Sequence, residues 1–309
     1  SMSYFKAKKT ELQAQILLET VRKKKEKNRK IIENLRKLKL NKKAVRIEDC
    51  GTFVYISEID NAAKITNANF CRERLCRVCA WRRQAKFVAQ TNEVLNSVAY
   101  LGLRYIFITL TVPNVKGTEA PQTISKMMKA WNKISRQKLF KNAAVGYIRS
   151  LEMTYNPERG DYHPHIHALV AVRNTYFQYA EYITADQLRQ SWADAYGVTV
   201  DHAANIPNID IKAVSLEQER KSMLEVLKYS LKWADTEMTP EVVSTFISAL
   251  TGRRLISFGG ILKEMRAALK QSDFDDPTTP EKETFEDIEK KYPTVLFKLT
   301  ERGFIEWQH

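Results

Sequence analysis

The sequence predicts an α+β fold in which an antiparallel sheet is flanked by helices. Residues 104–112 (RYIFITLTV) are rich in β-branched and aromatic side chains, which is typical of a buried strand. Residues 145–156 and 162–172 have the same character, and the PERGD segment between them contains Gly160, which suits a turn. Helical and strand-like segments are mixed without a repeated βαβ unit, which favours antiparallel pairing.

Helices are expected on both sides of this strand-rich region. Residues 4–40 contain no proline and combine one apolar stripe with a dense Lys/Arg face, which predicts an amphipathic helix or a helical hairpin. A coiled coil or a helix that packs on a partner would have the same pattern. Further helices are expected at residues 81–100, 121–139, 185–195 and 216–233.

Composition divides the chain into four parts, and no internal repeat is present. Residues 1–49 form a basic helical region, residues 50–80 hold every cysteine, and residues 81–270 contain the expected sheet. Residues 271–309 form an acidic tail, which we expect to be a linker into a short final element.

Charge is unevenly distributed along the chain. The formal net charge is +14, and residues 1–49 contribute 16 Lys/Arg against 6 Asp/Glu. A basic region of this kind favours a polyanionic partner such as nucleic acid, although a solvated helix face would look the same. No apolar run approaches the ~20 residues that cross a bilayer and no export signal is recognised, so we expect a cytoplasmic protein without membrane contact.

The four cysteines predict a metal site. Cys50, Cys71, Cys76 and Cys79 fall within 30 residues, and the last three follow C-x4-C-x2-C spacing. Disulfides are not expected in the cytoplasm, whereas four thiolates suit structural Zn²⁺. Four unconnected buried thiols are the alternative. Charged side chains that could meet DNA phosphates lie in the segment after Cys79 and in the basic helix: Arg82, Arg83, Lys86, Lys23, Lys24 and Lys25.

Three of the five histidines lie in the HPHIH segment, and they predict a second metal site. Alternate residues of a strand share one face, so His163, His165 and His167 would point the same way. Pairing through the PERGD turn would bring Glu152 close to His165. Imidazoles and a carboxylate together suit a divalent ion with open positions, such as Mn²⁺ or Mg²⁺.

One helical segment combines residue types that could cut a phosphodiester. In MLEVLKYSLKWAD (223–235), Glu225, Tyr229 and Lys232 share a helix face at positions i, i+4 and i+7. A tyrosine phenol can attack phosphorus and hold the product covalently, and a nearby carboxylate can act as a general base. A solvent-exposed helix face would present the same row of residues, and the tyrosines of YFQYAEY (176–182) are expected in a helix or in core packing.

Three stretches in this order resemble the rolling-circle plasmid replication initiators of the HUH endonuclease superfamily. FITLTVPN (107–114) resembles the first motif, HPHIHALV (163–170) is similar to the histidine motif, and EVLKYSLK (225–232) looks like the tyrosine motif. A single tyrosine with an upstream glutamate is found in one plasmid branch. The cysteine segment and GRRLISFGGILKE (252–264) also look like that branch, and the resemblance covers about residues 50–265.

The resemblance implies a five-stranded antiparallel sheet that carries the metal ligands, within an endonuclease domain at 81–270. His165 and His167 become ligands and Glu152 the third, while His163 lies just outside the two-histidine core. Tyr229 becomes the nucleophile, Glu225 the base for a terminating hydrolysis, and Lys232 the residue that assists the reacting phosphate.

The implied activity is the nicking of one strand of plasmid origin DNA, with a 5′-phosphotyrosyl enzyme and a 3′-hydroxyl primer as products. The implied partners are double-stranded and single-stranded origin DNA, a host helicase and polymerase, and a second copy of the chain. A transposase or relaxase would share this chemistry, although no helicase motif is seen. A non-catalytic zinc repressor with structural histidines is an alternative of another class.

Overall fold

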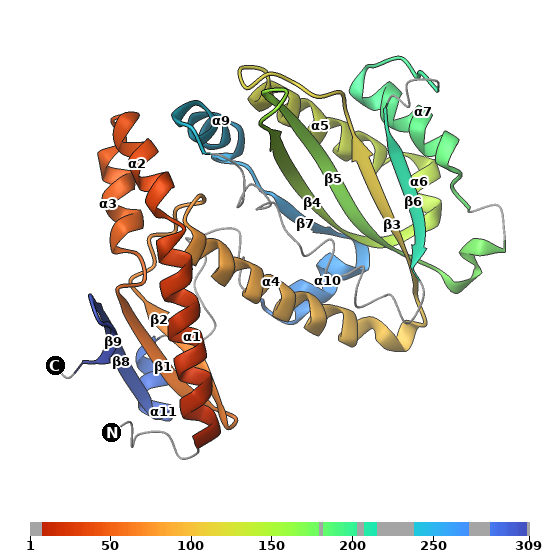
Figure 1. Ribbon diagram of the computed structural model, residues 1–309. Helices are drawn as coiled ribbons and strands as arrows, with labels where there is room; N and C mark the ends of the chain where they lie inside the picture. The colour runs from red at the N-terminus through yellow and green to blue at the C-terminus, as the bar shows by residue number, and fades with distance from the viewer. Residues whose placement is uncertain (1–7, 179–181, 203–206, 215–237, 272–284, 308–309) are drawn as a thin grey trace. The chain divides into compact units, whose positions relative to one another are not determined.

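The computed structural model describes residues 8–178, 182–202, 207–214, 238–271 and 285–307 (Figure 1). The chain divides into two compact units. One, here called the cysteine unit, comprises residues 1–83, 238–243 and 277–309, and the other, the histidine unit, comprises residues 84–237 and 244–276. No helix in the described ranges is both long and apolar enough to cross a bilayer.

The cysteine unit contains a four-stranded antiparallel sheet with the order β2-β1-β8-β9. Its strands are β1 (Phe53–Ile59), β2 (Ala62–Ala68), β8 (Thr294–Thr300) and β9 (Gly303–Glu306). The two-residue turn between β1 and β2 is made by Asp60 and Asn61, both of which have positive φ as a type I′ turn requires. The sheet therefore joins segments from opposite ends of the sequence.

The helix α1 lies against one face of this sheet. The long α1 (Lys8–Glu26) contacts β1 and β2, where Thr10 faces Glu58 and Gln13 accepts a hydrogen bond from the Ala63 amide (Figure 1). The shorter helices are α2 (Arg29–Lys37), α3 (Asn41–Asp49) and α11 (Phe285–Lys291). Ile31 and Leu35 of α2 are buried at i and i+4, so this basic helix has the apolar stripe that its sequence predicts.

The histidine unit is built on a five-stranded antiparallel sheet with the order β6-β3-β5-β4-β7. Its strands are β3 (Arg104–Thr111), β4 (Ala144–Asn156), β5 (Asp161–Val172), β6 (Ile209–Val214) and β7 (Ile256–Gly259). The long β4–β5 hairpin forms the centre, and its turn uses Gly160 at φ +65°. Alternation along β5 buries Ile166, Ala168 and Val170 on one face and leaves the histidines on the other.

Helices pack against this sheet, and a short helical turn follows β5. The structure gives α4 (Arg77–Val98), α5 (Ala120–Ile134), α6 (Lys138–Ala143), α7 (Ala185–Tyr196), α9 (Pro240–Leu250) and α10 (Gly260–Ala268), with 3₁₀ turns at Ala99–Leu101 and Asn174–Phe177. Trp131 of α5 packs edge-on against Tyr147 of β4, and Trp192 of α7 donates to the Thr111 carbonyl. The helix α7 starts with a capping box formed by Thr184 and Gln187.

The α+β class and the five-stranded antiparallel sheet are confirmed. The helices expected at 4–40 appear as α1 and α2, and those at 81–100 and 185–195 appear within a few residues of their predicted bounds. The single helix expected at 121–139 is instead divided between α5, which ends at Ile134, and α6, which begins at Lys138. The segment 216–233 lies outside the described residues. The sequence did not reveal that residues 294–306 form a hairpin, because the pairing partner β1 is more than 230 residues away.

Candidate metal centres

The central hairpin brings one carboxylate and two imidazoles together. Glu152 of β4 pairs with His165 of β5, and Pro164 and Ile166 point to the opposite face. One ligand atom from each of Glu152, His165 and His167 lies within 4.8 Å of the others. The sequence predicted this group from strand alternation and the PERGD turn, and the register of the hairpin provides it.

The Glu152 carboxylate is buried between the two imidazoles. Its Oε2 lies 3.1 Å from His165 Nε2 and 3.5 Å from His167 Nε2. Burial alone would raise the pKa of Glu152, but hydrogen bonds from His165 and His167 outweigh it and hold the pKa at about 2. Its Oε1 is buried and accepts no hydrogen bond from the described residues. A buried carboxylate with an unused oxygen is well suited to a cation.

Neighbouring oxygens fix the orientation of both imidazoles. Thr109 Oγ1 of β3 lies 3.1 Å from His167 Nδ1, and the His163 carbonyl oxygen lies 3.2 Å from His165 Nδ1. Because both Nδ1 atoms are occupied, the two Nε2 atoms face Glu152, as they do in histidines that bind metals through Nε2. The three side chains therefore fit a divalent metal ion and leave coordination positions for a substrate or water.

The His163 side chain contacts Asn114 and does not join the Glu152, His165 and His167 group. Its Nδ1 lies 2.7 Å from Asn114 Oδ1, and burial, followed by the nearby His165, lowers its pKa. The group whose ligand atoms converge contains Glu152, His165 and His167, and His163 is outside it. His163 contributes to that group through its carbonyl oxygen, which accepts from His165.

The predicted nucleophile and its neighbours, Tyr229, Glu225 and Lys232, lie outside the described residues. Among the tyrosines considered as alternatives, Tyr176 is fully buried, and its hydroxyl accepts a hydrogen bond from the Ile183 amide. Tyr182 is exposed, and Tyr179 is outside the described residues. Tyr176 therefore occupies the core position that the sequence suggested.

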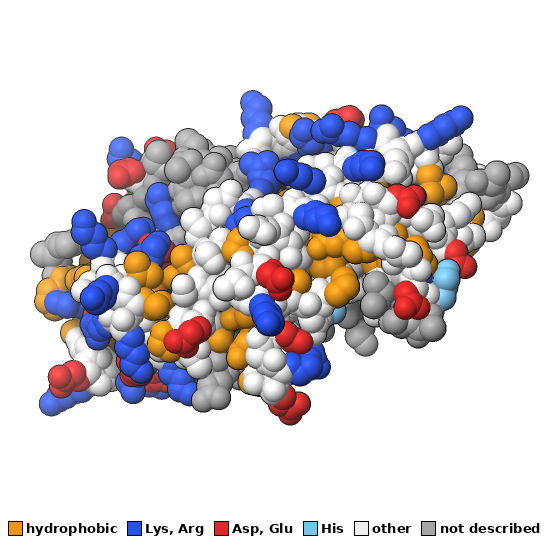
Figure 2. Space-filling view, turned by 90° about the horizontal axis from the view of Figure 1, so that it is seen from above, with side chains coloured by type: hydrophobic (Ala, Val, Ile, Leu, Met, Phe, Trp, Pro, Cys, Tyr) orange, Lys and Arg blue, Asp and Glu red, His pale blue; other side chains and the backbone are white. Residues whose placement is uncertain are grey.

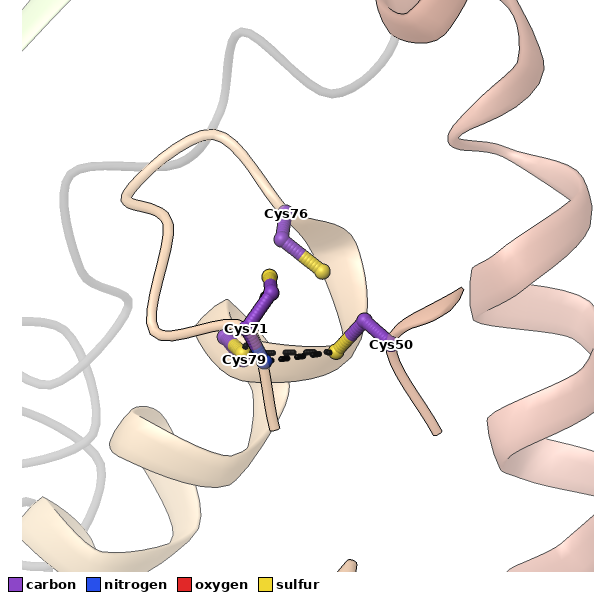
Figure 3. A group of neighbouring side chains, drawn as sticks. All are labelled: Cys50, Cys71, Cys76 and Cys79. Atoms are coloured by element: carbon purple, nitrogen blue, oxygen red, sulfur yellow. Dashed lines mark hydrogen bonds between the residues drawn. The ribbon is translucent and has the colours of Figure 1, made fainter. Parts of the chain in front are cut away.

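All four cysteines converge in the cysteine unit (Figure 3). They are buried and form no disulfide, and Cys79 Sγ lies 3.5 Å from Cys50 Sγ and 3.6 Å from Cys71 Sγ. The edge of a zinc–thiolate tetrahedron is about 3.8 Å when each Zn–S bond is about 2.3 Å. The spacing thus fits a tetrahedral ion, and it brings in Cys50 despite its distance in sequence.

Hydrogen bonds around the sulfurs support thiolate ligands. The amides of Cys71 and Arg72 donate to Cys50 Sγ and Cys79 Sγ. Hydrogen bonding with Cys50 lowers the pKa of Cys76 and raises the pKa of Cys71, because a thiolate at one sulfur is stabilised by neighbouring thiols that keep their protons. A bound metal would take up the charge of all four thiolates.

The basic N-terminal helices supply part of this environment, which the sequence did not reveal. Asn28 Nδ2 lies 3.5 Å from Cys76 Sγ, while Asn28 Oδ1 accepts from the Arg77 amide. The Lys25 ammonium donates to the carbonyl oxygens of Glu48 and Cys50 at 2.7 Å each, and burial lowers its pKa. The helix pair α1–α2 and the cysteine segment are therefore one folded structure.

The other residues predicted to contact DNA differ in their surroundings. Lys23 is exposed and pairs with Glu19, and the Arg82 guanidinium lies over the Phe70 ring. Arg83 donates to the Arg74 carbonyl, while Lys24 and Lys86 are partly exposed. Lys and Arg side chains are spread over the face shown in Figure 2, with acidic side chains between them. Their contact with DNA stays a prediction.

Comparison with known proteins places the chain among replication proteins. Residues 62–303 match the family model described as Rep_1, replication protein. A "Protein rep" of Streptococcus pneumoniae serotype 2 (strain D39) is 32% identical over 235 residues, which cover 74% of this chain and 72% of that protein. A "Protein rep" of Bacillus amyloliquefaciens is 35% identical over 254 residues, with coverage of 75% and 74%.

A third relative also has the name "Protein rep". A "Protein rep" of a Bacillus species is 33% identical over 259 residues, covering 76% of this chain and 83% of that protein. No solved structure matches significantly. The family match spans the whole histidine unit and less than half of the cysteine unit, and the identity to the relatives extends over about three quarters of the chain. The chain therefore belongs to the Rep_1 family of replication proteins.

Proposed function

We propose that this protein initiates rolling-circle replication of a plasmid by nicking one strand of its origin. The observation that carries the proposal is the convergence of Glu152, His165 and His167 on one face of the sheet of a Rep_1 protein. Mn²⁺ or Mg²⁺ held there would polarise a non-bridging oxygen of the scissile phosphate. The single tyrosine of the EVLKYSLK segment, Tyr229, is the proposed nucleophile.

The nick is a transesterification that balances without a further reactant. The phenolic oxygen of Tyr229 forms a bond to phosphorus as the bond to the 3′ oxygen of the preceding nucleotide breaks. The proton lost by the phenol is balanced by the proton that the 3′ oxygen gains to become a hydroxyl, and the 5′ phosphate remains on the tyrosine. Lys232 would stabilise the developing negative charge on the phosphate. A host polymerase would then extend the 3′-hydroxyl while a host helicase opens the duplex.

The proposed nicking reaction requires both single-stranded and double-stranded origin DNA. The scissile strand would be single-stranded or extruded, so that its phosphate can reach Glu152, His165 and His167. The basic helices and the cysteine segment would bind the flanking duplex through phosphate contacts. Action on a plasmid places the protein in the bacterial cytoplasm.

The activity is tested with labelled single-stranded oligonucleotides that tile both strands of the DNA that encodes the protein. Purified protein with Mn²⁺ should cut one oligonucleotide at one position and leave a protein-linked 5′ fragment. A zinc repressor would shift the labelled DNA in a gel and leave it whole. A two-tyrosine transposase would instead retain attachment after its first tyrosine is removed.

Replacement of Glu225 by Gln is expected to separate the two cuts of the replication cycle. In the proposed cycle Glu225 activates water for the terminating hydrolysis, while the first attack uses Tyr229 as the nucleophile and needs no water. The variant should form the covalent adduct at the wild-type rate but lose release by about 10²- to 10⁴-fold, the usual contribution of a general base. Adduct formation and decay are followed on denaturing gels, and unchanged decay would remove Glu225 from the mechanism.

We infer that the four-cysteine site holds structural Zn²⁺. Cys76→Ser should reduce bound zinc from one ion per chain to nearly none and lower the melting temperature by roughly 10 °C or more, because zinc binding is coupled to folding. Val78→Ala is the matched control, since Val78 is equally buried beside Cys76 but offers no ligand. Zinc content is measured by atomic emission spectrometry, and full zinc content in Cys76→Ser would contradict the assignment.

A further inference from the structure

One face of the sheet in the cysteine unit carries two rows of large side chains. Phe53, Lys298 and Ile305 are directly paired across β1, β8 and β9. In the next row Tyr55 pairs with Leu296, and the Trp307 amide donates to the Leu296 carbonyl. Because alternate residues share a face, both rows lie on the same side of the sheet.

This face is only partly open, since Leu296 in its second row is 8% exposed, whereas the opposite face is core. Val54 and Phe297, which point to the other side, are 1% and 0% exposed. Trp307 and Ile305 are 38% and 44% exposed, and Phe53 and Lys298 are half-buried. Single exposed apolar side chains are common on protein surfaces, whereas large ones that lie next to each other are typical of a binding surface.

A cation lies within the aromatic surface. The Lys298 ammonium is 3.8 Å from the centroid of the Trp307 ring and 5.6 Å from that of the Phe53 ring. Both rings therefore have a positive charge beside them. The cysteine unit as a whole has 27 Lys/Arg and 17 Asp/Glu, so it carries +10 of the net +14. The surface is thus aromatic, cationic and part of a basic unit.

We propose that this face, made by Phe53, Lys298, Ile305 and Trp307, binds single-stranded DNA by base stacking. Aromatic rings on an open sheet can stack on unpaired bases, whatever their sequence, while a lysine between them attracts the backbone phosphates. Duplex DNA does not fit this role because its base faces are covered by their neighbours. The inference rests on the proposed function, since nicking and unwinding at the origin expose the single strand that would bind here.

The test uses full-length protein with Tyr229→Phe, so that binding is measured without cleavage. The probe is fluorescein-labelled oligothymidylate, and the dissociation constant is measured by anisotropy at several salt concentrations. Trp307→Ala should weaken binding by about 5- to 150-fold, the range for losing one stacked base, while Trp307→Phe should keep most of the affinity. Lys298→Gln should reduce the slope of log affinity against log salt by about 0.7.

Tyr100→Ala is the matched control, because Tyr100 is an aromatic residue that is 79% exposed outside this face. Zinc content and melting temperature show that each variant is folded, and Trp307→Phe and Lys298→Gln keep the test decisive if Trp307→Ala unfolds. Oligothymidylate affinity that is equal in Trp307→Ala and Tyr100→Ala would overturn the proposal. So would a change in oligomeric mass of Trp307→Ala without a change in affinity, because the face would then bind a second copy.

These outcomes are separate from those of the nicking assay. Loss of oligothymidylate binding in Trp307→Ala supports the stacking surface even if no oligonucleotide is nicked, because this probe requires no cleavage. Nicking with unchanged oligothymidylate binding in the variant supports the proposed function and rejects the surface.

Discussion

Tyr229→Phe is expected to abolish the covalent protein–DNA adduct. The phenolic oxygen is the only atom that the substitution removes, and it is the atom proposed to bond to phosphorus. Removal of an enzymatic nucleophile lowers the rate by roughly a millionfold, so no adduct should be detected on a denaturing gel. Binding of the same origin oligonucleotide should remain, because ring stacking and phosphate contacts are unchanged.

Tyr182→Phe provides the matched control for this experiment. Tyr182 is also a tyrosine, and its side chain is exposed, but it is not the proposed nucleophile. The loss of its hydroxyl should therefore leave the adduct at the wild-type level. An adduct retained by Tyr229→Phe and lost by Tyr182→Phe would move the nucleophile to the YFQYAEY segment.

Substitution at the Glu-His-His group is expected to have the second largest effect. His165→Ala removes one of two imidazoles that converge on the buried Glu152 carboxylate. Loss of a ligand should weaken Mn²⁺ binding, and nicking should fall by about 10³-fold or more because the metal contributes several kcal/mol of charge stabilisation. Titration calorimetry with Mn²⁺ and the nicking rate measure the two effects independently.

Glu152→Gln tests the same site through charge. The pKa of Glu152 is lowered to about 2, so the group is a carboxylate at any pH used in such assays and the substitution removes a full negative charge. This variant should lose Mn²⁺ affinity as His165→Ala does. His202→Ala is the control, since His202 is exposed and outside the converging group. Wild-type Mn²⁺ affinity in both ligand variants would show that the group is structural.

The convergence of Glu152, His165 and His167 could be predicted because these residues are local in sequence. One turn and the period of two residues along a strand are enough to place Glu152 beside His165. The orientation by Thr109 could not be predicted in the same way, although FITLTVPN was identified as a motif. Thr109 belongs to β3, and its register against β5 depends on packing across a connection of about 50 residues.

The cysteine unit shows the limits of prediction from composition. Residues 271–309 are acidic and predict a linker into a short final element; in the structure β8 and β9 of this region pair with β1 in one sheet. Alternation in TVLFKLT (294–300) is the signal that could have identified this strand. Asn28 and Lys25 were part of a basic run, and only the tertiary fold turns them toward the cysteines.

In the proposed mechanism, Tyr229 and an ion held by Glu152, His165 and His167 act on the same phosphate. It is tested most directly by mass spectrometry of tryptic peptides after reaction with the origin oligonucleotide and Mn²⁺. We expect a nucleotide adduct on the peptide that contains Tyr229, and no such adduct when the reaction uses His165→Ala protein. An adduct on another tyrosine, or one on Tyr229 that forms equally well in His165→Ala, would contradict it.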